Sequence, residues 1–500
     1  MIETFFNQLK EKKEVRAALS GLRAEIKEPE KLEKFRKLIG EGEILLPFLQ
    51  DTDPKVRKNV AALLGDLQME NAAEAIFLAY KNEETMFVKS TLLLALEKTN
   101  AYPYLSELQE RYTELCTVVP KENEKKHIQE ELRAIEKILR KEGPDKGHTF
   151  IGWKEKVTVI LTTNPKYREI TAEELQEKHL AYRIGLTALG VRACVDDLRA
   201  VTQIRTFREL LFPIKLGQTI TVKDKPEVLG KALADSNILP LLKKCHKEDS
   251  PFYFRLEMRS GMTLEERSRY TKKAACAIEE GSDRMLLNST DEYEVEIRIL
   301  SNKEGEIRTF LKMNTMEMER FAYRKASIAA SMHPSSAAML MHLAKPYLKE
   351  NAQILDPCCG VGTMLVERHK ILPAREIYGI DIFGDAIEKA KTNCEAANVR
   401  VNFIHKDYLD FKHKYLFDEI IANMPVRGKK TKEEQDNFYA GFFTKSLELL
   451  APEGNIILYA NEDGFIKKQL RLHPKLRLKQ EFVIREKDKF VLYIIGLREK

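Results

Sequence analysis

The chain has 500 residues, of which 43% are hydrophobic and 32% charged, and it carries a formal net charge of +6. This composition excludes a disordered chain and predicts a soluble globular protein of about three domains, at ~100–200 residues each. No apolar run approaches the ~18 residues of a membrane span, and the N-terminal residues lack the apolar core of a secretory signal. The seven cysteines are scattered, so neither a disulfide framework nor a metal site is expected. We expect a cytoplasmic protein without membrane association, and its mild positive charge is compatible with a polyanionic partner.

Residues 1 to about 142 have helical apolar spacing and contain an internal repeat. The segments DPKVRKNVAALLGDL (53–67) and ETMFVKSTLLLALEK (84–98) align at an offset of 32 residues, and each follows an apolar segment. A period in this range predicts a stack of helical hairpins that bury their faces on one another. The first copy resembles HEAT repeats, in which an Asp-Pro turn leads into Val-Arg. We therefore predict a HEAT-like helical repeat over residues 1–145, with a plain helical bundle as the alternative.

Residues 150–325 combine short strands with helices, which is typical of an α+β domain. EKVTVILTT (155–163) alternates like a strand, and Thr171 and Glu174 have the spacing of a capping box at the start of a helix. A strand, a long helix and a hairpin follow between residues 252 and 314. The stretch TTNPKYREITAEEL resembles the opening of THUMP-containing RNA methyltransferases, and the block 252–314 resembles the THUMP core. The resemblance implies a THUMP-like RNA-binding domain.

From residue 326 onward, strand and helix segments alternate, which indicates a parallel α/β sheet. Five strands are expected in QILDPCC, EIYGIDI, VNFIHKD, FDEIIANMP and NIILYAN. The last two strands, LRLKQEFVIRE and KFVLYIIGLRE, are joined only by KDK, so they must be antiparallel. This layout is that of Rossmann-like methyltransferases, and it predicts such a domain over residues 326–500.

The stretch ILDPCCGVGTMLVE (354–367) has the form of a strand, a glycine turn and a helix. Such a turn presents backbone N–H groups and the positive helix end to a ligand. A dinucleotide site would require G-x-G-x-x-G, but Leu365 occupies the third glycine position after Gly360 and Gly362. Asp356 precedes the turn, and its carboxylate would repel pyrophosphate and attract an ammonium group. S-adenosyl-L-methionine carries an ammonium group and no phosphate, so we predict it as the cofactor.

Two further strand ends carry aspartates. Asp381 lies 21 residues past Gly360, about the distance at which an acidic side chain binds both ribose hydroxyls. Asp407 ends the third strand and is expected to accept a hydrogen bond from an adenine amino group, with Ile382 and Tyr408 flanking the ring. Neighbouring parallel strands end at one crevice, so these residues are predicted to form the cofactor site together with Asp356, Cys358, Gly360 and Gly362.

The segment FDEIIANMPVRGKK (417–430) places Asn423 at the fourth strand end. It resembles the Asn-Pro-Pro-aromatic motif of methyltransferases that modify exocyclic amino groups. The resemblance implies that the Asn423 amide oxygen and the Met424 carbonyl accept the N–H groups of the amine, with Pro425 fixing the turn. Such a site needs positioning and electrostatics rather than a strong base. Met424 in place of the first proline keeps the carbonyl, whereas Val426 in place of the aromatic removes a stacking face worth about 1–3 kcal/mol.

Two segments beside this site complete the prediction. Arg427, Lys429 and Lys430 are expected to contact RNA phosphate, with a solvated loop as the alternative. The helix SMHPSSAAMLMHLA (331–344) resembles the segment that precedes the cofactor motif in THUMP-type guanine-N2 methyltransferases. That resemblance implies that Ser335 or Ser336 caps the helix and faces the methionine end of the cofactor. His333 is expected to be a surface or capping residue and not a base.

The patterns together predict a multidomain chain: an all-α repeat, an α+β THUMP-like domain and an α/β Rossmann-like methyltransferase domain. The resemblance implies methylation of an exocyclic amine in structured RNA, with guanine N2 as the favoured atom and tRNA or rRNA as the substrate. The target base would swing out of its stack, and the helical repeat would extend the RNA footprint or bind a protein partner. Two alternatives remain: a non-catalytic RNA- or protein-binding scaffold, and an enzyme acting on adenine N6 or on a protein side-chain amide.

Overall fold

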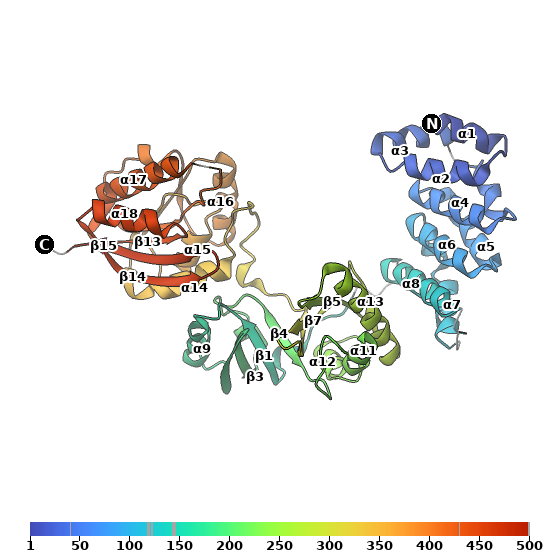
Figure 1. The fold of residues 1–500 in the computed structure, drawn as a ribbon, viewed down its shortest axis with the longest axis horizontal. Helices are drawn as coiled ribbons and strands as arrows, with labels where there is room; N and C mark the ends of the chain where they lie inside the picture. Colours follow the sequence, from blue (N-terminus) through green and yellow to red (C-terminus); the bar gives the residue numbers. More distant parts are fainter. Residues whose placement is uncertain (41, 118–120, 122–123, 143–146, 430, 499–500) are drawn as a thin grey trace. The chain divides into compact units, whose positions relative to one another are not determined.

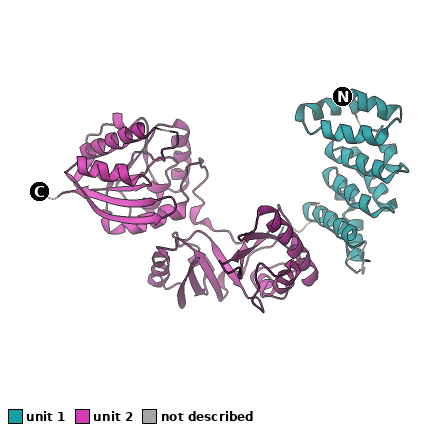
Figure 2. Cartoon of the chain, in the orientation of Figure 1, with its two compact units in different colours: residues 1–147 teal, residues 148–500 magenta. Residues whose placement is uncertain are grey.

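The computed structural model describes the chain except residues 41, 118–120, 122–123, 143–146, 430 and 499–500. The chain divides into two compact units, residues 1–147 and residues 148–500 (Figure 2). Among the described residues, no helix is long and apolar enough to span a membrane. Each unit has its own hydrophobic core, and each is described separately below.

Residues 1–147 form an all-helical unit in which successive helices stack side by side (Figure 1). The apolar stripes of these helices meet in one core, because residues three and four apart lie on the same face. The helices are α1 (Ile2–Lys10), α2 (Val15–Glu25), α3 (Pro29–Ile39), α4 (Pro54–Asp66), α5 (Ala73–Asn82), α6 (Met86–Lys98), α7 (Leu105–Thr117) and α8 (Lys125–Glu142).

The two sequence copies form the stacked helices α4 and α6. Asp53 caps α4 by accepting the backbone N–H of Lys55. Arg57 of α4 donates to both carboxylate oxygens of Glu83, at 2.8 and 2.7 Å, and Glu83 in turn accepts the N–H of Thr85 at the start of α6. The Val-Arg of the first copy therefore ties it to the second. The apolar segment before α4 forms only a short 3-10 helix, Leu46–Gln50, rather than a full helix.

Residues 148–325 are built on an eight-stranded sheet in the order β2-β3-β1-β4-β8-β7-β5-β6. The strands are β1 (Val157–Thr162), β2 (Arg183–Thr187), β3 (Gly190–Val195), β4 (Leu210–Ile214), β5 (Phe252–Arg259), β6 (Leu286–Asn288), β7 (Val295–Ser301) and β8 (Ile307–Met313). One face packs on helices α9 (Arg168–Glu177), α10 (Leu198–Val201), α11 (Pro226–Ala234), α12 (Ile238–Cys245) and α13 (Leu264–Gly281). The α+β prediction for this region agrees with this architecture.

The capping box predicted at Thr171 and Glu174 is wrong. Helix α9 begins three residues earlier, at Arg168, so Thr171 lies inside it and its hydroxyl hydrogen-bonds with that of Thr206 at 2.8 Å. A capping box does open α13, where Thr263 and Glu266 satisfy each other's backbone N–H groups.

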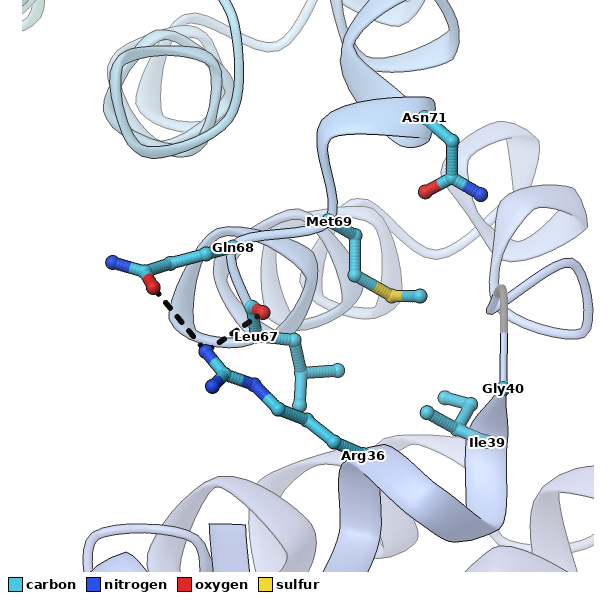
Figure 3. A pocket seen from close by; sticks show the side chains of 7 residues that line it. All are labelled: Arg36, Ile39, Gly40, Leu67, Gln68, Met69 and Asn71. Atoms are coloured by element: carbon cyan, nitrogen blue, oxygen red, sulfur yellow. Dashed lines mark hydrogen bonds between the residues drawn. The ribbon is translucent and has the colours of Figure 1, made fainter. Parts of the chain in front are cut away.

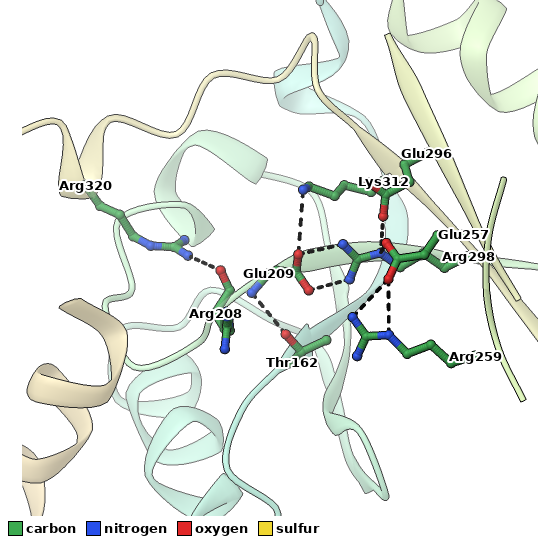
Figure 4. Close-up of polar contacts among 9 residues, drawn as sticks. All are labelled: Thr162, Arg208, Glu209, Glu257, Arg259, Glu296, Arg298, Lys312 and Arg320. Atoms are coloured by element: carbon green, nitrogen blue, oxygen red, sulfur yellow. Dashed lines mark hydrogen bonds and ion pairs between the residues drawn. The ribbon is translucent and has the colours of Figure 1, made fainter. Parts of the chain in front are cut away.

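The other face of the eight-stranded sheet carries arginines. Strand registers place seven basic side chains on it: Arg183, Arg192, Arg255, Arg259, Arg298, Arg308 and Lys312. Arg298 is paired with Glu209 and Glu296, while Glu257 pairs with Arg259 (Figure 4). A small apolar cluster of Ile160, Leu211 and Phe310 lies between the basic groups, and it includes no helical residue. We call this surface the arginine face.

Residues 326–498 form a seven-stranded sheet in the order β11-β10-β9-β12-β13-β15-β14. The strands are β9 (Gln353–Asp356), β10 (Glu376–Asp381), β11 (Asn402–His405), β12 (Phe417–Asn423), β13 (Leu450–Ala460), β14 (Leu476–Arg485) and β15 (Phe490–Leu497). The helices are α14 (Pro334–Ala344), α15 (Thr363–Ile371), α16 (Gly384–Ala396), α17 (Lys432–Leu449) and α18 (Asp463–Leu472). Strands β9 to β13 are parallel, and β15 is antiparallel to both β13 and β14. The predicted antiparallel pairing of the last two strands is therefore confirmed.

Candidate active site

The predicted glycine turn connects β9 to α15 at the carboxyl edge of the sheet. Gly360 and Gly362 have φ of +53° and +79°, in the left-handed region that glycine enters without steric cost. A Cβ at Gly362 would lie 3.0 Å from the Sγ of Cys394, whereas one at Gly360 would meet no described atom within 4 Å. The turn is thus packed against the protein on one side and open on the other.

Carboxylates already engage the backbone N–H groups of this turn. Asp356 accepts the N–H of Cys358 at 3.0 Å, and Asp381 accepts the N–H of Gly360 at 2.9 Å. The N–H of Cys359 goes to the Ile380 carbonyl at 2.9 Å. A pyrophosphate group would need such N–H groups for itself, so the turn does not fit a dinucleotide. The structure brings Asp356 and Asp381 together around one turn, as predicted.

Asp356 is almost fully buried, with 1% of its surface exposed. Burial raises the pKa of its carboxyl to about 8, the N–H of Cys358 opposes that shift, and the nearby Asp381 adds to it. Thr363, the first residue of α15, has a buried hydroxyl oxygen without a hydrogen-bond partner in the described chain. A carboxyl that lacks a cation and a hydroxyl that lacks a partner fit a ligand carrying an ammonium group.

The remaining predicted cofactor residues differ in exposure: Asp407 and Ile382 are exposed, whereas Tyr408 is buried. Asp407 follows β11, is exposed, and uses its carboxylate to accept the N–H of Leu409. Ile382 follows Asp381 and is 57% exposed, which leaves its side chain available to a ring at this edge. Tyr408 does not flank that edge: its ring packs near Phe442 and its hydroxyl bonds the Ser446 hydroxyl in the core. Tyr408 is therefore corrected from a cofactor-flanking residue to a core residue.

The helix α14 packs against α15, the helix that follows the turn, but its cap is not a serine. His333 is the N-cap and accepts the N–H of Ser335, whose buried hydroxyl also bonds the His333 ring at 2.7 Å. Partial burial and the guanidinium groups of Arg208 and Arg320 lower the pKa of His333 to about 4, so the ring is neutral at pH 7. The cap is thus His333, one of the two roles expected for it, and the cap predicted at Ser335 or Ser336 is wrong.

Asn423 is the last residue of β12 and lies opposite Tyr459 of β13. Its side-chain amide is half-buried and makes no hydrogen bond with any residue that the structure describes. The N–H of Met424 donates to the Tyr459 carbonyl at 2.9 Å, and the Met424 side chain is buried in the core. Pro425 and Val426 are exposed. The strand end thus holds an amide free to accept from, or donate to, a ligand.

The basic residues after this strand end lie on an exposed loop. Arg427 and Lys429 form no ion pair with another described residue. Gly428 between them has φ of +57°. Lys430, the third predicted RNA contact, lies outside the described residues.

Three residues at the site escaped the sequence analysis. Thr363 directly follows Gly362, and Phe383, which is 65% exposed, directly follows Ile382. Both residues could therefore have been predicted from the same motifs. Asn393 of α16 donates to the carbonyls of Val361 and Ala326 at 3.1 and 2.9 Å, which ties the glycine turn to the segment before α14. No sequence signal marks Asn393, because its role depends on how α16 packs.

A separate cavity of about 530 Å³ lies in residues 1–147, lined by Arg36, Ile39, Gly40, Leu67, Gln68, Met69 and Asn71 (Figure 3). Arg36 closes one side by donating to the Leu67 carbonyl and the Gln68 amide oxygen. The cavity contains no predicted site residue. Across the described chain, no group of three His, Cys, Asp or Glu residues is arranged to hold a metal ion.

Comparison with known proteins agrees with this fold. Residues 329–493 match the family model "Methyltransferase small domain". The "Bifunctional methyltransferase" of Rickettsia felis is 31% identical over 142 residues, which are 28% of this chain and 25% of that protein. The chain therefore spans about a quarter of the length of that relative.

Two solved structures resemble residues of both sheets. TrmN from Thermus thermophilus has a TM-score of 0.50 at 19% identity, covering 68% of this chain and 99% of TrmN. SMU.472, solved in complex with SAH, has a TM-score of 0.52 at 16% identity, covering 69% of this chain and all of SMU.472. At these identities the similarity establishes the fold. Residues 329–493 thus match a methyltransferase family model, and the C-terminal part of the chain has the fold of SMU.472, a protein solved with SAH bound.

Proposed function

We propose that this protein transfers a methyl group from S-adenosyl-L-methionine to an exocyclic amine of a base in tRNA or rRNA, with guanine N2 as the target atom. The observation that carries the proposal is the Asn423 amide, which has no hydrogen-bond partner among the described residues and lies at the strand end beside the glycine turn. Asp356 on the neighbouring strand β9 and Asp381 on β10, the strand beyond it, hold that turn.

Each residue has a definite task in this reaction. Asp356 and Asp381 bind the ammonium and ribose groups of the cofactor, which supplies an electrophilic methyl group when bound. The Asn423 amide oxygen and the Met424 carbonyl accept the two N–H groups of the base amine, so that its lone pair is directed at the methyl carbon. Met424 keeps its carbonyl in place because its N–H is fixed by Tyr459. The exposed Val426 offers little stacking area, so another side chain has to support the base.

The arginine face supports RNA as the substrate. Four of its guanidinium groups, those of Arg183, Arg192, Arg255 and Arg308, have no carboxylate partner among the described residues. Guanidinium groups bind phosphates with two N–H donors at once, and A-form RNA is recognised largely through its backbone. A THUMP-like role for residues 150–325 in binding structured RNA is part of this proposal. Arg427 and Lys429 would contact phosphate nearer the target base.

The helical unit has a different charge balance. Residues 1–147 contain 25 Lys and Arg against 27 Asp and Glu, whereas residues 148–500 contain 58 against 50. A net negative unit gains little from a polyanion, so we propose that the HEAT-like repeat binds a protein partner rather than extending the RNA footprint. A cytoplasmic location, where tRNA and ribosomes are found, belongs to the same proposal.

The deciding experiment compares modified nucleosides from tRNA and rRNA of cells with and without this gene, by mass spectrometry. We expect one N2-methylguanosine to be lost. Loss of an N6-methyladenosine instead would show that the target atom is adenine N6, and the roles proposed for Asn423 and Met424 would stay the same. Titration of the purified protein with S-adenosyl-L-methionine distinguishes the scaffold alternative, because a non-catalytic scaffold has no need to bind the cofactor.

A further inference from the structure

A buried salt bridge joins the eight-stranded domain to the helix that follows the glycine turn. Arg205, between α10 and β4, donates through Nε and Nη2 to the two carboxylate oxygens of Glu367 in α15, at 2.8 and 2.7 Å. Its third nitrogen, Nη1, donates to the Arg320 carbonyl at 2.6 Å. Glu367 is 1% exposed. A bidentate pair fixes both distance and orientation, so α15 has a defined position against the domain that carries the arginine face.

The same carboxylate holds the segment that connects the two sheets. The Tyr323 hydroxyl donates to Oε1 of Glu367 at 2.7 Å. The Arg205 guanidinium also lies over the Phe321 ring, 4.9 Å from its centroid. Glu367 of α15 therefore binds both Arg205, in the loop before β4, and Tyr323, in the segment that connects the two sheets.

The next residue of α15 makes a second buried salt bridge, toward the acceptor strand. Arg368 donates to both carboxylate oxygens of Glu419 at 2.6 and 2.7 Å, and neither side chain is exposed. Glu419 lies in β12, four residues before Asn423, and side chains an even number apart share one face of a strand. Two consecutive ion pairs thus connect Arg205 to the strand that ends in Asn423.

We propose that Arg205 is a positioning residue for methyl transfer. Through Glu367 it fixes the distance between the arginine face, where RNA is held, and the glycine turn and Asn423, where the base reacts. This inference rests on the proposed function for the identity of the substrate. Arg205 touches neither cofactor nor base, so its loss leaves both binding steps intact and misplaces the base relative to the methyl group.

The structure offers a matched control in a second ion pair between the same two regions. Lys166, in the loop before α9, pairs with Glu486 after β14 at 2.6 Å, but their side chains are 40% and 75% exposed. An exposed pair constrains geometry weakly, and this one touches neither α15 nor β12. Lys166→Ala therefore removes one ion pair between the regions without disturbing the connection to Asn423.

The test uses the full-length chain as wild type, Arg205→Ala, Arg205→Lys and Lys166→Ala, with unfractionated tRNA and rRNA from cells lacking the gene. We expect Arg205→Ala to keep cofactor and RNA affinities within about twofold while kcat falls by about 10–100-fold, the cost of a misplaced substrate. Methylation should also spread to neighbouring nucleotides. The kcat of Arg205→Lys should lie between those of the wild type and Arg205→Ala, and the kcat of Lys166→Ala should equal that of the wild type.

Three results would overturn the proposal: unchanged kcat in Arg205→Ala, an equal loss in Lys166→Ala, or a loss of cofactor affinity as large as the loss in kcat. Hydrogen exchange of the α15 amides tests the salt bridge without a substrate. It should rise in Arg205→Ala and not in Lys166→Ala, and equal exchange in the two variants would also overturn the inference. Absence of methylation by the wild type, with the exchange difference present, would reject the proposed function alone.

Discussion

The two sheets of residues 148–500 carry opposite charges on two of their surfaces. At the carboxyl edge of the seven-stranded sheet, Asp356 and Asp381 surround a glycine turn whose N–H groups they occupy. On the open face of the eight-stranded sheet, Arg192 and Arg308 stand without carboxylate partners among the residues described. The first arrangement suits a cationic ligand and the second a polyanion.

The two surfaces also differ in how they are built. Asp356 is buried, Asp381 is half-buried, and both accept fixed backbone hydrogen bonds, so each is expected to contribute a large, specific effect. The four arginines without a carboxylate partner are exposed and spread over several strands, so each is expected to contribute a small effect that depends on salt. Mutations at the two surfaces should therefore differ in size and in kind.

The largest effect is expected at Asn423. Asn423→Ala removes the proposed acceptor of the reacting amine, and loss of one such group typically lowers kcat by about 10²–10³-fold. Cofactor affinity should stay within about twofold of the wild-type value. Asn402→Ala is the matched control, because Asn402 is the first residue of β11, at the amino edge of the sheet, and its amide bonds only Glu376 among the described residues. Full methylation activity in Asn423→Ala, measured with tritiated cofactor, would remove the role assigned to this residue.

The next effect is expected at Asp381. Its carboxylate accepts the N–H groups of Gly360 and Phe383, each at 2.9 Å, and is proposed to bind the ribose. Losing hydrogen bonds to a charged group costs about 1.5–3 kcal/mol each, so Asp381→Ala should weaken cofactor binding by about 10–100-fold. Asp385→Ala, which removes an exposed partner of Lys389, should leave the affinity unchanged. Calorimetric titration measures both, and equal affinities would exclude the ribose role.

A smaller, pH-dependent effect is expected at Asp356. Its raised pKa means that the folded protein holds a proton that the unfolded chain, with a pKa near 3.9, has already released. This group therefore contributes stability at low pH that is lost as pH rises through about 8. A bound ammonium group favours the ionised carboxylate, so cofactor binding should release a proton.

The measurement is cofactor affinity between about pH 5.5 and 7, where the cofactor amino group, with a pKa near 7.7–8.0, stays protonated. Affinity should rise by up to about tenfold per pH unit over this range. Asp356→Asn cannot ionise and should show a flat profile. A flat profile in the wild type would mean that the carboxyl is already ionised before the cofactor binds.

The same comparison separates what the sequence could predict from what it could not. The glycine turn, Asp356 and Asp381 lie within short strand–turn motifs, so neighbouring residues indicated their joint position. The alternation of strands and helices, together with the short KDK connection, was sufficient to predict the antiparallel pairing of β14 and β15. Local sequence therefore predicted those features that depend on residues close together in the chain.

Side-chain direction was the first thing the sequence could not supply. Tyr408 follows a strand end, as a cofactor-flanking residue would, but its ring turns into the core toward Phe442. Similarly, a serine was expected to cap α14 and His333 to be either a surface or a capping residue, and in the structure His333 is the cap. In both cases the sequence did not distinguish between the possible roles of neighbouring residues, and side-chain packing determines which role each residue has.

The arginine face could not be found in the sequence at all. Its residues lie on five strands between Arg183 and Lys312, and a shift of one residue in any register would move a side chain to the helical face. Strands β2, β3 and β4 were not predicted, so their registers were unknown. A surface made by long-range pairing becomes visible only in the folded chain.

The smallest effects of mutation are expected on the arginine face. They test most directly whether the two surfaces bind ligands of opposite charge. Arg192→Ala and Arg308→Ala should each weaken RNA binding only a few-fold, and each should lower the slope of log affinity against log salt by about one, as loss of one phosphate contact does. Lys273→Ala, an exposed charge on the opposite, helical side in α13, should change neither. Cofactor affinity should be the same in all three, because no arginine of this face contacts the glycine turn. An unchanged salt slope in both arginine variants would mean that RNA, if bound, lies elsewhere, and the opposition between a cation-binding edge and a polyanion-binding face would not hold.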